Sequence, residues 1–184
     1  MFGKYPKAEQ AVYLRMHLRK AIITEPPIIW TILQQAIEQR KLDGSDQWQD
    51  GYPNEQTITS DINNGNAYVL ADEQIVVAYA AIIFEVEPAY TAIRGKWLSE
   101  GDYAVVHRVA TANAYKGKGI ATALFGMIEK LCLEKNVHSI KVDTNFDNVP
   151  MLKILDRLGY TYCGEVFFRG SPRRAFEKLL LVNN

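Results

Sequence analysis

The chain has 184 residues, of which 48% are hydrophobic and 23% are charged, and its 21 basic residues balance its 21 acidic ones. This composition is typical of a folded globular protein, and the length favours a single domain over residues 1–184. A net charge of zero provides no general attraction for nucleic acid or for an anionic membrane, so we expect neither as a partner. The first residues lack the apolar core of a signal peptide and no apolar run could span a bilayer. We therefore expect a cytoplasmic protein, and the role of residues 1–17 stays open.

The first half of the chain alternates strand and helix patterns. In chain order these predict a strand at 18–23, a helix at 24–41, an aromatic-bearing loop at 43–54, a helix at 55–63, and hairpin strands at 67–71 and 75–86. Thr24 is the expected N-cap of the first helix, ahead of two prolines that suit a first helical turn. The helix itself carries one apolar stripe at helical spacing.

The second half continues the alternation after a less regular stretch at 88–101. It predicts a strand at 103–111, a helix at about 118–135, a strand at 139–144, a helix at 149–158, and a closing pair of strands at 160–169 and 175–182. The turn of that pair is expected at Gly-Ser-Pro-Arg, residues 170–173. The order indicates a mixed α-β fold, with a mixed twisted sheet of about six to seven strands, helices on both faces, and a final antiparallel hairpin.

The helix expected near residue 118 has no capping side chain in front of it. The stretch Ala-Tyr-Lys-Gly-Lys-Gly-Ile-Ala, residues 114–121, places glycines and lysines where Ser, Thr, Asp or Asn normally accepts the free N–H groups. Glycine lets a ligand approach the backbone, and the start of a helix attracts anions. The pattern predicts a phosphate-bearing ligand here, and its structural alternative is a solvated turn. The spacing fits neither a Walker loop nor a dinucleotide-binding loop, whose third glycine would fall on Thr122.

The same stretch resembles the [Q/R]-x-x-G-x-[G/A] loop of the GNAT N-acetyltransferase superfamily, with Lys116 in place of Gln or Arg. Upstream, His-Arg-Val-Ala-Thr at 107–111 looks like the strand that leads into that loop. Downstream, the segment from Asn148 to Tyr160 is similar to the family's N-x-x-A-x-x-L-Y-x-x-x-G-F helix. The resemblance covers roughly residues 66–170 and implies the GNAT-like acyl-CoA N-acyltransferase fold.

The resemblance implies acetyl-CoA as co-substrate and a primary amine of a small molecule or peptide as acceptor. It assigns to acetyl-CoA binding Val109, Ala110, Thr111, Lys116, Gly117, Lys118, Gly119, Ile120, Ala121, Thr122 and Asn148. Loop amides would hold the pyrophosphate, and the main chain of 109–111 and Asn148 would contact the pantetheine. The sequence leaves open whether the acyl group is acetyl or longer. It also leaves open whether the chain forms a homodimer.

Two residues are the preferred candidates for the general base, His107 and Asp143. Histidine titrates near neutral pH, and a carboxylate inside an apolar strand is affected by burial. Their structural alternatives are a hydrogen-bonded core histidine and an ion pair of Asp143 with Arg108. The tyrosine that usually acts as acid in the family aligns with Leu155, which cannot donate a proton.

Acceptor recognition is predicted from aromatic and acidic residues on loops and strand ends. These are Trp48, Tyr52, Glu85, Trp97 and Tyr103, whose alternative role is packing onto the core. No His, Cys or carboxylate spacing matches a metal site, so we predict no metal. Cys132 and Cys163 are expected to be free buried thiols.

Two functions remain open. The first is an acetyl-CoA-dependent N-acetyltransferase, which we favour. The second is a CoA-binding sensor or accessory domain of the same fold without turnover, which the leucine at position 155 makes credible. Thiol release with an amine panel distinguishes them.

Overall fold

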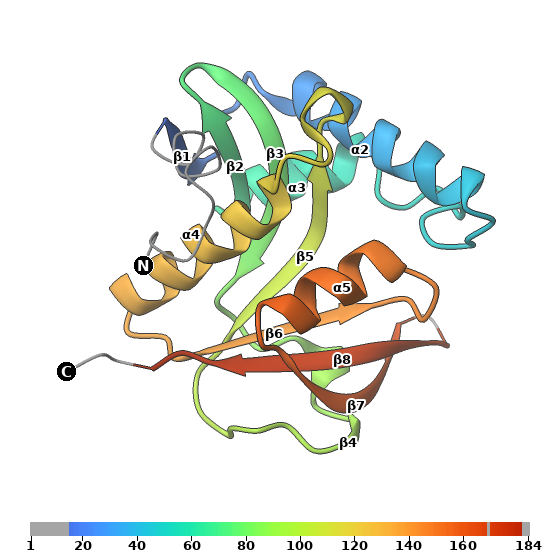
Figure 1. Ribbon diagram of the computed structural model, residues 1–184, viewed down its shortest axis with the longest axis vertical. Coiled ribbons are helices and arrows are strands. Elements are labelled where there is room, and N and C mark those ends of the chain that lie inside the picture. Colours follow the sequence, from blue (N-terminus) through green and yellow to red (C-terminus); the bar gives the residue numbers. More distant parts are fainter. Residues whose placement is uncertain (1–14, 169, 182–184) are drawn as a thin grey trace. The chain divides into compact units, whose positions relative to one another are not determined.

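The computed structural model describes residues 15–168 and 170–181, and Figure 1 shows their arrangement. The strands are β1 (Met16–Lys20), β2 (Ala67–Asp72), β3 (Ile75–Ile83), β4 (Arg94–Gly95), β5 (Ala104–Thr111), β6 (Ser139–Thr144), β7 (Thr161–Phe168) and β8 (Ser171–Leu179). The helices are α2 (Pro26–Leu42), α3 (Glu55–Asn63), α4 (Ile120–Glu134) and α5 (Val149–Arg157), with 3-10 turns η2 (Pro88–Tyr90) and η3 (Asn113–Tyr115).

The strands within this described part form one sheet in the order β1-β2-β3-β5-β6-β8-β7-β4. The pair β5–β6 is parallel, whereas β1–β2, β2–β3, β6–β8, β7–β8 and β4–β7 are antiparallel. The mixed α-β prediction is confirmed, with one strand more than the six to seven expected.

The chain's contacts divide into two compact units, one up to Ala81 together with Arg108–Met127, the other Ile82–His107 together with Ile128 onward. The expected single domain over 1–184 stays a prediction. In the first unit, α3 lies behind β2 and β3 in the view of Figure 1. The core here joins one face of α2 and α3 to the strands, and its fully buried members include Ile29, Leu33, Ile58, Val69 and Tyr79.

The second unit has a smaller aromatic core and a buried carboxylate. Tyr90, Val105, Val166 and Ala175 are buried together. The fully buried Glu177 accepts hydrogen bonds from the backbone N–H of Leu98 (2.5 Å) and from the hydroxyls of Ser99 (2.5 Å) and Ser139 (2.7 Å). Because a buried charge needs such partners, Glu177 fixes the irregular segment after β4 against β6 and β8.

Two boundary predictions were wrong for identifiable reasons. The N-cap of α2 is Glu25 rather than Thr24, because the Glu25 carboxylate accepts from Ile22 N (2.9 Å) and pairs with Arg19 (2.6 Å). That ion pair lowers the pKa of Glu25. At the other end of the chain, β8 begins at Ser171 instead of Ala175, since Pro172 lies near the strand end, where proline is tolerated.

Other elements match within a few residues. The strand expected at 18–23 is β1, the long hairpin strand ends at Ile83 instead of Val86, and the helix expected from Lys118 begins at Ile120. Cys132 and Cys163 are free and buried, as predicted. Among the described residues no helix is long and apolar enough to cross a membrane.

Strand β4, which stands last in the order of the sheet, depends on two facing glycines. It pairs Arg94 with Glu165 and Gly95 with Gly164. A Cβ on Gly95 would lie 2.1 Å from the carbonyl oxygen of Cys163, and one on Gly164 would lie 2.2 Å from that of Arg94. Both glycines also have positive φ, at 148° and 136°. A two-residue strand held by close backbone contact carries no hydrophobic alternation, so the sequence offered no signal for it.

We expect Gly164→Ala to lower the free energy of unfolding by about 1–3 kcal/mol, because the new methyl group meets backbone rather than a movable side chain. The matched control is Gly126→Ala on α4, where a Cβ would meet nothing within 4 Å. Replacing that helical glycine should raise stability by about 0.5–1 kcal/mol. Urea denaturation of both variants measures the two changes. Equal stability of the two variants would contradict the close-contact account.

Candidate functional site

The loop before α4 leaves a row of backbone amides without acceptors. Residues 116–119 form turns in which Gly117 and Gly119 have φ of 76° and 74°. Of the amides nearby, Lys116 N bonds to Asn113 O (3.2 Å) and Ala123 N to Gly119 O (2.9 Å). The amides of residues 117–122 have no acceptor within the described part of the chain. N–H groups of this kind at a helix start are suited to an anion, and the predicted anion site stays a prediction.

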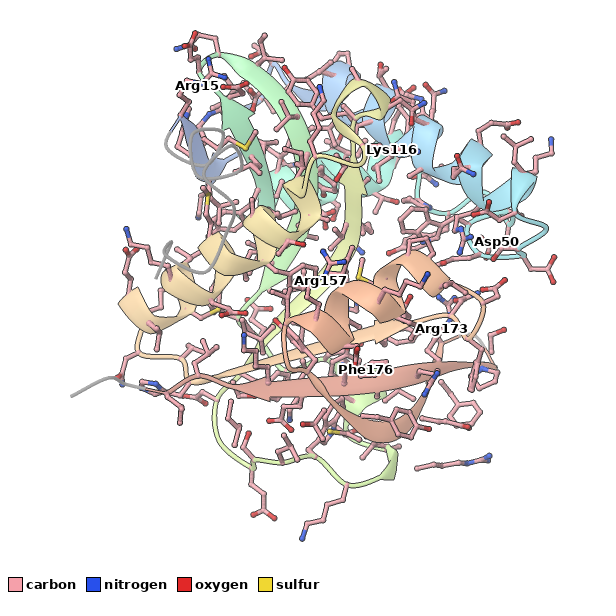
Figure 2. The ribbon with its side chains drawn as sticks, viewed as in Figure 1. Arg15, Asp50, Lys116, Arg157, Arg173 and Phe176 are labelled. Atoms are coloured by element: carbon pink, nitrogen blue, oxygen red, sulfur yellow. The ribbon has the colours of Figure 1, made fainter. Side chains whose placement is uncertain are left out.

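The side chains of this loop add exposed positive charge. Lys116 and Lys118 are exposed, whereas Ile120 and Thr122 are buried. Figure 2 shows Lys116 on the loop that joins β5 to α4. A Cβ on Gly117 would meet nothing within 4 Å, so the space beside this backbone is open to a ligand. The loop therefore fits the pyrophosphate of acetyl-CoA in backbone geometry and in charge.

Strand β5, which leads into this loop, changes its backbone direction at Arg108. Its register with β6 runs from Ala104 to Val106 in the residues described, and Arg108 has φ of 56°. This left-handed conformation is unusual for a residue with a long side chain and costs about 1–3 kcal/mol. The backbone groups of 109–111, predicted to contact the pantetheine, follow directly after this residue.

A buried ion pair holds Arg108 in place. Its Nε and Nη2 donate to the two carboxylate oxygens of Asp61, at 2.9 and 2.7 Å. Tyr79 donates its hydroxyl hydrogen to the same carboxylate (2.5 Å), and Arg108 Nη1 donates to the hydroxyl of Tyr52. Burial and the Asp61 charge raise the pKa of Tyr79. Burial would lower the pKa of Arg108, but Tyr52 and Asp61 outweigh it and the pKa is raised. The predicted alternative pairing of Arg108 with Asp143 is therefore wrong.

His107, the residue before Arg108, lies between two carboxylates of the second unit. Its Nε2 is 3.2 Å from Glu87 Oε2 and its Nδ1 is 3.5 Å from Asp143 Oδ1. Asp143 also accepts the hydroxyl hydrogen of Tyr90 at 2.7 Å. The side chains of His107 and Asp143 are 14% and 7% exposed, so both are largely buried and the imidazole is the more exposed of the two. The two predicted base candidates thus belong to one cluster.

Aromatic rings surround this cluster. The Tyr90 and Phe168 rings lie 6.1 and 5.9 Å from the imidazole of His107, edge-on to it. Burial raises the pKa of Tyr90 well above its ordinary value, and the neighbouring Asp143 charge raises it further. Tyr90 therefore stays protonated and remains a donor to Asp143. Trp97 donates Nε1–H to Tyr90 O (2.9 Å), and Tyr103 accepts from Glu87 N (3.2 Å).

Other predicted residues have defined surroundings as well. Trp48 packs against the core of the first unit, and Glu85 is exposed. Asn148 is the N-cap of α5, accepting from Met151 N at 3.3 Å. Leu155 is fully buried. The acceptor and cofactor roles of these residues stay predictions.

The sequence reasoning missed several members of the two networks. Glu87 was overlooked in favour of Glu85, two residues earlier, because Glu85 was expected near the end of the strand at 75–86, whereas Glu87 lay outside it. Asp61 and Tyr79 were read only as members of a helix and a strand. A carboxylate on the apolar side of a short helix was the signal for Asp61. No group of three or more His, Cys, Asp or Glu side chains in residues 15–168 and 170–181 is placed to hold a metal ion.

Comparison with known proteins identifies the class. The model of the Acetyltransferase (GNAT) family matches residues 31–160. A GNAT-family acetyltransferase from Streptococcus agalactiae has a solved structure with a TM-score of 0.83 and 37% identity, covering 91% of this chain and 96% of that one. One from Listeria monocytogenes has a TM-score of 0.72 and 21% identity, covering 90% and 95%. A streptothricin acetyltransferase of Escherichia coli is 26% identical over 72 residues, 39% of this chain and only 41% of that protein.

The chain belongs to the GNAT family of acetyl-CoA-dependent acetyltransferases. The predicted membership of the GNAT superfamily is confirmed by this assignment. The fold and the family together make acetyl transfer the class of chemistry to be explained.

Removing Asp61 tests the role of the buried ion pair. Asp61→Ala should lower the free energy of unfolding by about 3–5 kcal/mol, because it leaves the Arg108 charge buried without a partner. The control is Glu134→Ala on α4, which breaks the exposed pair with Lys130 (3.7 Å) and should change stability by less than about 0.5 kcal/mol. Urea denaturation with a fitted slope measures both. A loss below about 1 kcal/mol for Asp61→Ala would show that the pair does not hold β5.

Proposed function

We propose that this protein transfers an acetyl group from acetyl-CoA to a primary amine of a small molecule or peptide. The observation that carries the proposal is the row of acceptor-free amides at 117–122, joined by β5 to the carboxylate–imidazole cluster. The loop supplies N–H groups and lysine charge for the pyrophosphate, and the main chain of 109–111 would pair with the pantetheine. We expect the protein to act in the cytoplasm, without nucleic acid, membrane or metal.

The cluster around His107 supports recognition of an amine. A primary amine arrives as an ammonium ion, and Glu87 and Asp143 provide negative charge on both sides of the imidazole. We assign His107 as the general base: Nε2 takes the proton from the ammonium group, while Asp143 orients the ring through Nδ1. Glu87, whose Oε2 lies 3.2 Å from Nε2, accepts a hydrogen bond from the ammonium, and the imidazole enters the reaction neutral, with its one proton on Nδ1. Tyr90 keeps Asp143 in position from the other side.

The transfer balances as follows. The amine nitrogen, once deprotonated by His107, forms a bond to the thioester carbonyl carbon, the carbon–sulfur bond breaks, and CoA leaves as thiolate, while the nitrogen releases its second proton to solvent or to the departing sulfur. The proposed base His107 and the proposed pantetheine contact Val109 are two residues apart on β5. The proton for the thiolate comes from solvent or from another group, or the thiolate leaves unaided, since its pKa of about 8.5 allows this.

The buried Leu155 favours a second candidate, a CoA-binding sensor without turnover. No proton donor stands at this position, where the family usually has tyrosine. Both candidates require the same cofactor loop, so binding alone does not distinguish them. Turnover that depends on His107 does.

Ligand-induced stabilisation tests the loop. Acetyl-CoA at a hundredfold excess over its dissociation constant should raise the melting temperature by roughly 5–10 °C. Gly117→Asp should abolish this shift by placing a carboxylate beside the pyrophosphate. The matched control is Gly159→Asp, which has the same backbone conformation (φ of 77° against 76°) and equally open surroundings, but follows α5. If both variants keep the shift, the loop is a solvated turn and the proposal fails.

Turnover tests the cluster. His107→Gln should lower kcat for acetylation by about 10²–10⁴-fold while acetyl-CoA still raises the melting temperature, because general base catalysis has this magnitude. Thiol release with a panel of amines is the measurement, and Tyr162→Phe on the distant part of β7 is the control. Binding of acetyl-CoA without thiol release from any amine would instead establish the sensor.

A further inference from the structure

Two polar atoms near the His107 cluster are buried and have no partner. They are Oδ1 of Asn145 and Nε of Arg173, neither of which has a hydrogen-bond partner anywhere in residues 15–168 and 170–181. Arg173 also forms no ion pair in this part of the chain. A buried donor or acceptor left unpaired costs about 1–3 kcal/mol, so such atoms call for an explanation. Their surroundings indicate a ligand.

The strand register places both atoms at one end of the pair β6–β8. That ladder ends with the pair Thr144 and Arg174; Arg173 is the next residue on β8, and Asn145 directly follows the last residue of β6. One step back, Asp143 pairs with Ala175. Because alternate residues of a strand point to the same face, Arg173 shares a face with Ala175 and therefore with Asp143. As a diagonal neighbour it lies about 7–8 Å from Asp143 between Cα atoms.

The same face carries an apolar wall. On β7, Val166 pairs with Arg173, and Phe168, two residues further, lies on the same side. Phe168 is the ring that also faces His107. Figure 2 shows Arg173 on β8 toward its hairpin end. A guanidinium, the carboxylate Asp143 of the His107 cluster and the apolar ring of Phe168 therefore share one face of the sheet in the second unit.

The free Nε–H determines what the guanidinium can hold. A carboxylate bound side-on to arginine takes two parallel hydrogen bonds, one from Nε–H and one from an Nη–H. We propose that Arg173 binds a carboxylate of the acceptor in this way, while Asn145 Oδ1 accepts a hydrogen bond from its amine. The acceptor is then a free amino acid, a molecule whose amine and carboxylate lie a few ångströms apart. This rests on the proposed acetylation of an amine and narrows its substrate class.

Matched acceptor pairs test the assignment. Each free L-amino acid is compared with its amide, which has the same amine and side chain but no carboxylate, in a thiol-release assay with acetyl-CoA. The wild-type protein should favour the acids, and in Arg173→Met the ratio of kcat/KM for acid over amide should fall about 10–100-fold. Arg173→Lys should recover only part of the preference, since lysine lacks the planar fork.

The control variant is Arg174→Met, the adjacent arginine on the opposite face, whose guanidinium lies 4.9 Å from the Tyr162 ring. It loses the same charge and should keep the wild-type ratio. Equal use of acids and amides by the wild type, or an unchanged ratio in Arg173→Met, would overturn the inference. Acetylation of carboxylate-free 1,4-diaminobutane but of no amino acid would also overturn it, yet leave amine acetylation standing. Acetyl-CoA binding with no acceptor used at all would overturn both.

Discussion

The strand that carries the site depends on one buried ion pair, that of Arg108 with Asp61. Arg108 has a left-handed backbone conformation in the middle of β5, which arginine does not favour. A carboxylate that accepts two hydrogen bonds from the guanidinium and one from Tyr79 offsets this cost. The neighbours of Arg108 in the chain are the residues of the candidate site. His107, which contacts Glu87 and Asp143, precedes Arg108, and the backbone of 109–111, predicted to contact pantetheine, follows it.

The different roles proposed for Arg108 and His107 follow from how the charge of each side chain is paired. Arg108 and Asp61 satisfy each other, so they stabilise the strand and have little left for a substrate. The imidazole of His107, by contrast, has one carboxylate near each nitrogen, so an incoming ammonium can replace the imidazole as the partner of Glu87 and donate to Nε2. Exchange of this kind is less costly than breaking a buried pair such as Arg108–Asp61. Proton transfer is therefore expected at His107 and structural support at Arg108, although the two residues are adjacent.

The fold could be predicted largely from local patterns, because most elements carry a helical or alternating apolar period. The family could also be predicted, from the glycine loop and the α5 segment, because the backbone conformation of such a loop requires glycines that can be recognised in the sequence. What could not be predicted was pairing between residues of different elements. Glu25 displaced Thr24 as cap through an ion pair with Arg19, β4 depends on two glycines meeting across strands, and Asp61 reaches Arg108 across 47 positions of the chain. None of these interactions leaves a period or motif in the sequence.

The balanced net charge also concealed how the charges are distributed. Lys116, Lys118 and a helix start give the loop a local excess of positive charge, which suits phosphate, while Glu87 and Asp143 give the His107 cluster a local excess of negative charge, which suits an ammonium ion. The acetyl-CoA of this family is anionic and the acceptor proposed above is an amine, so the two sites would have opposite charge preferences. The net charge reports only the sum over all residues, so its value of zero excludes a general attraction for polyanions without excluding a local one.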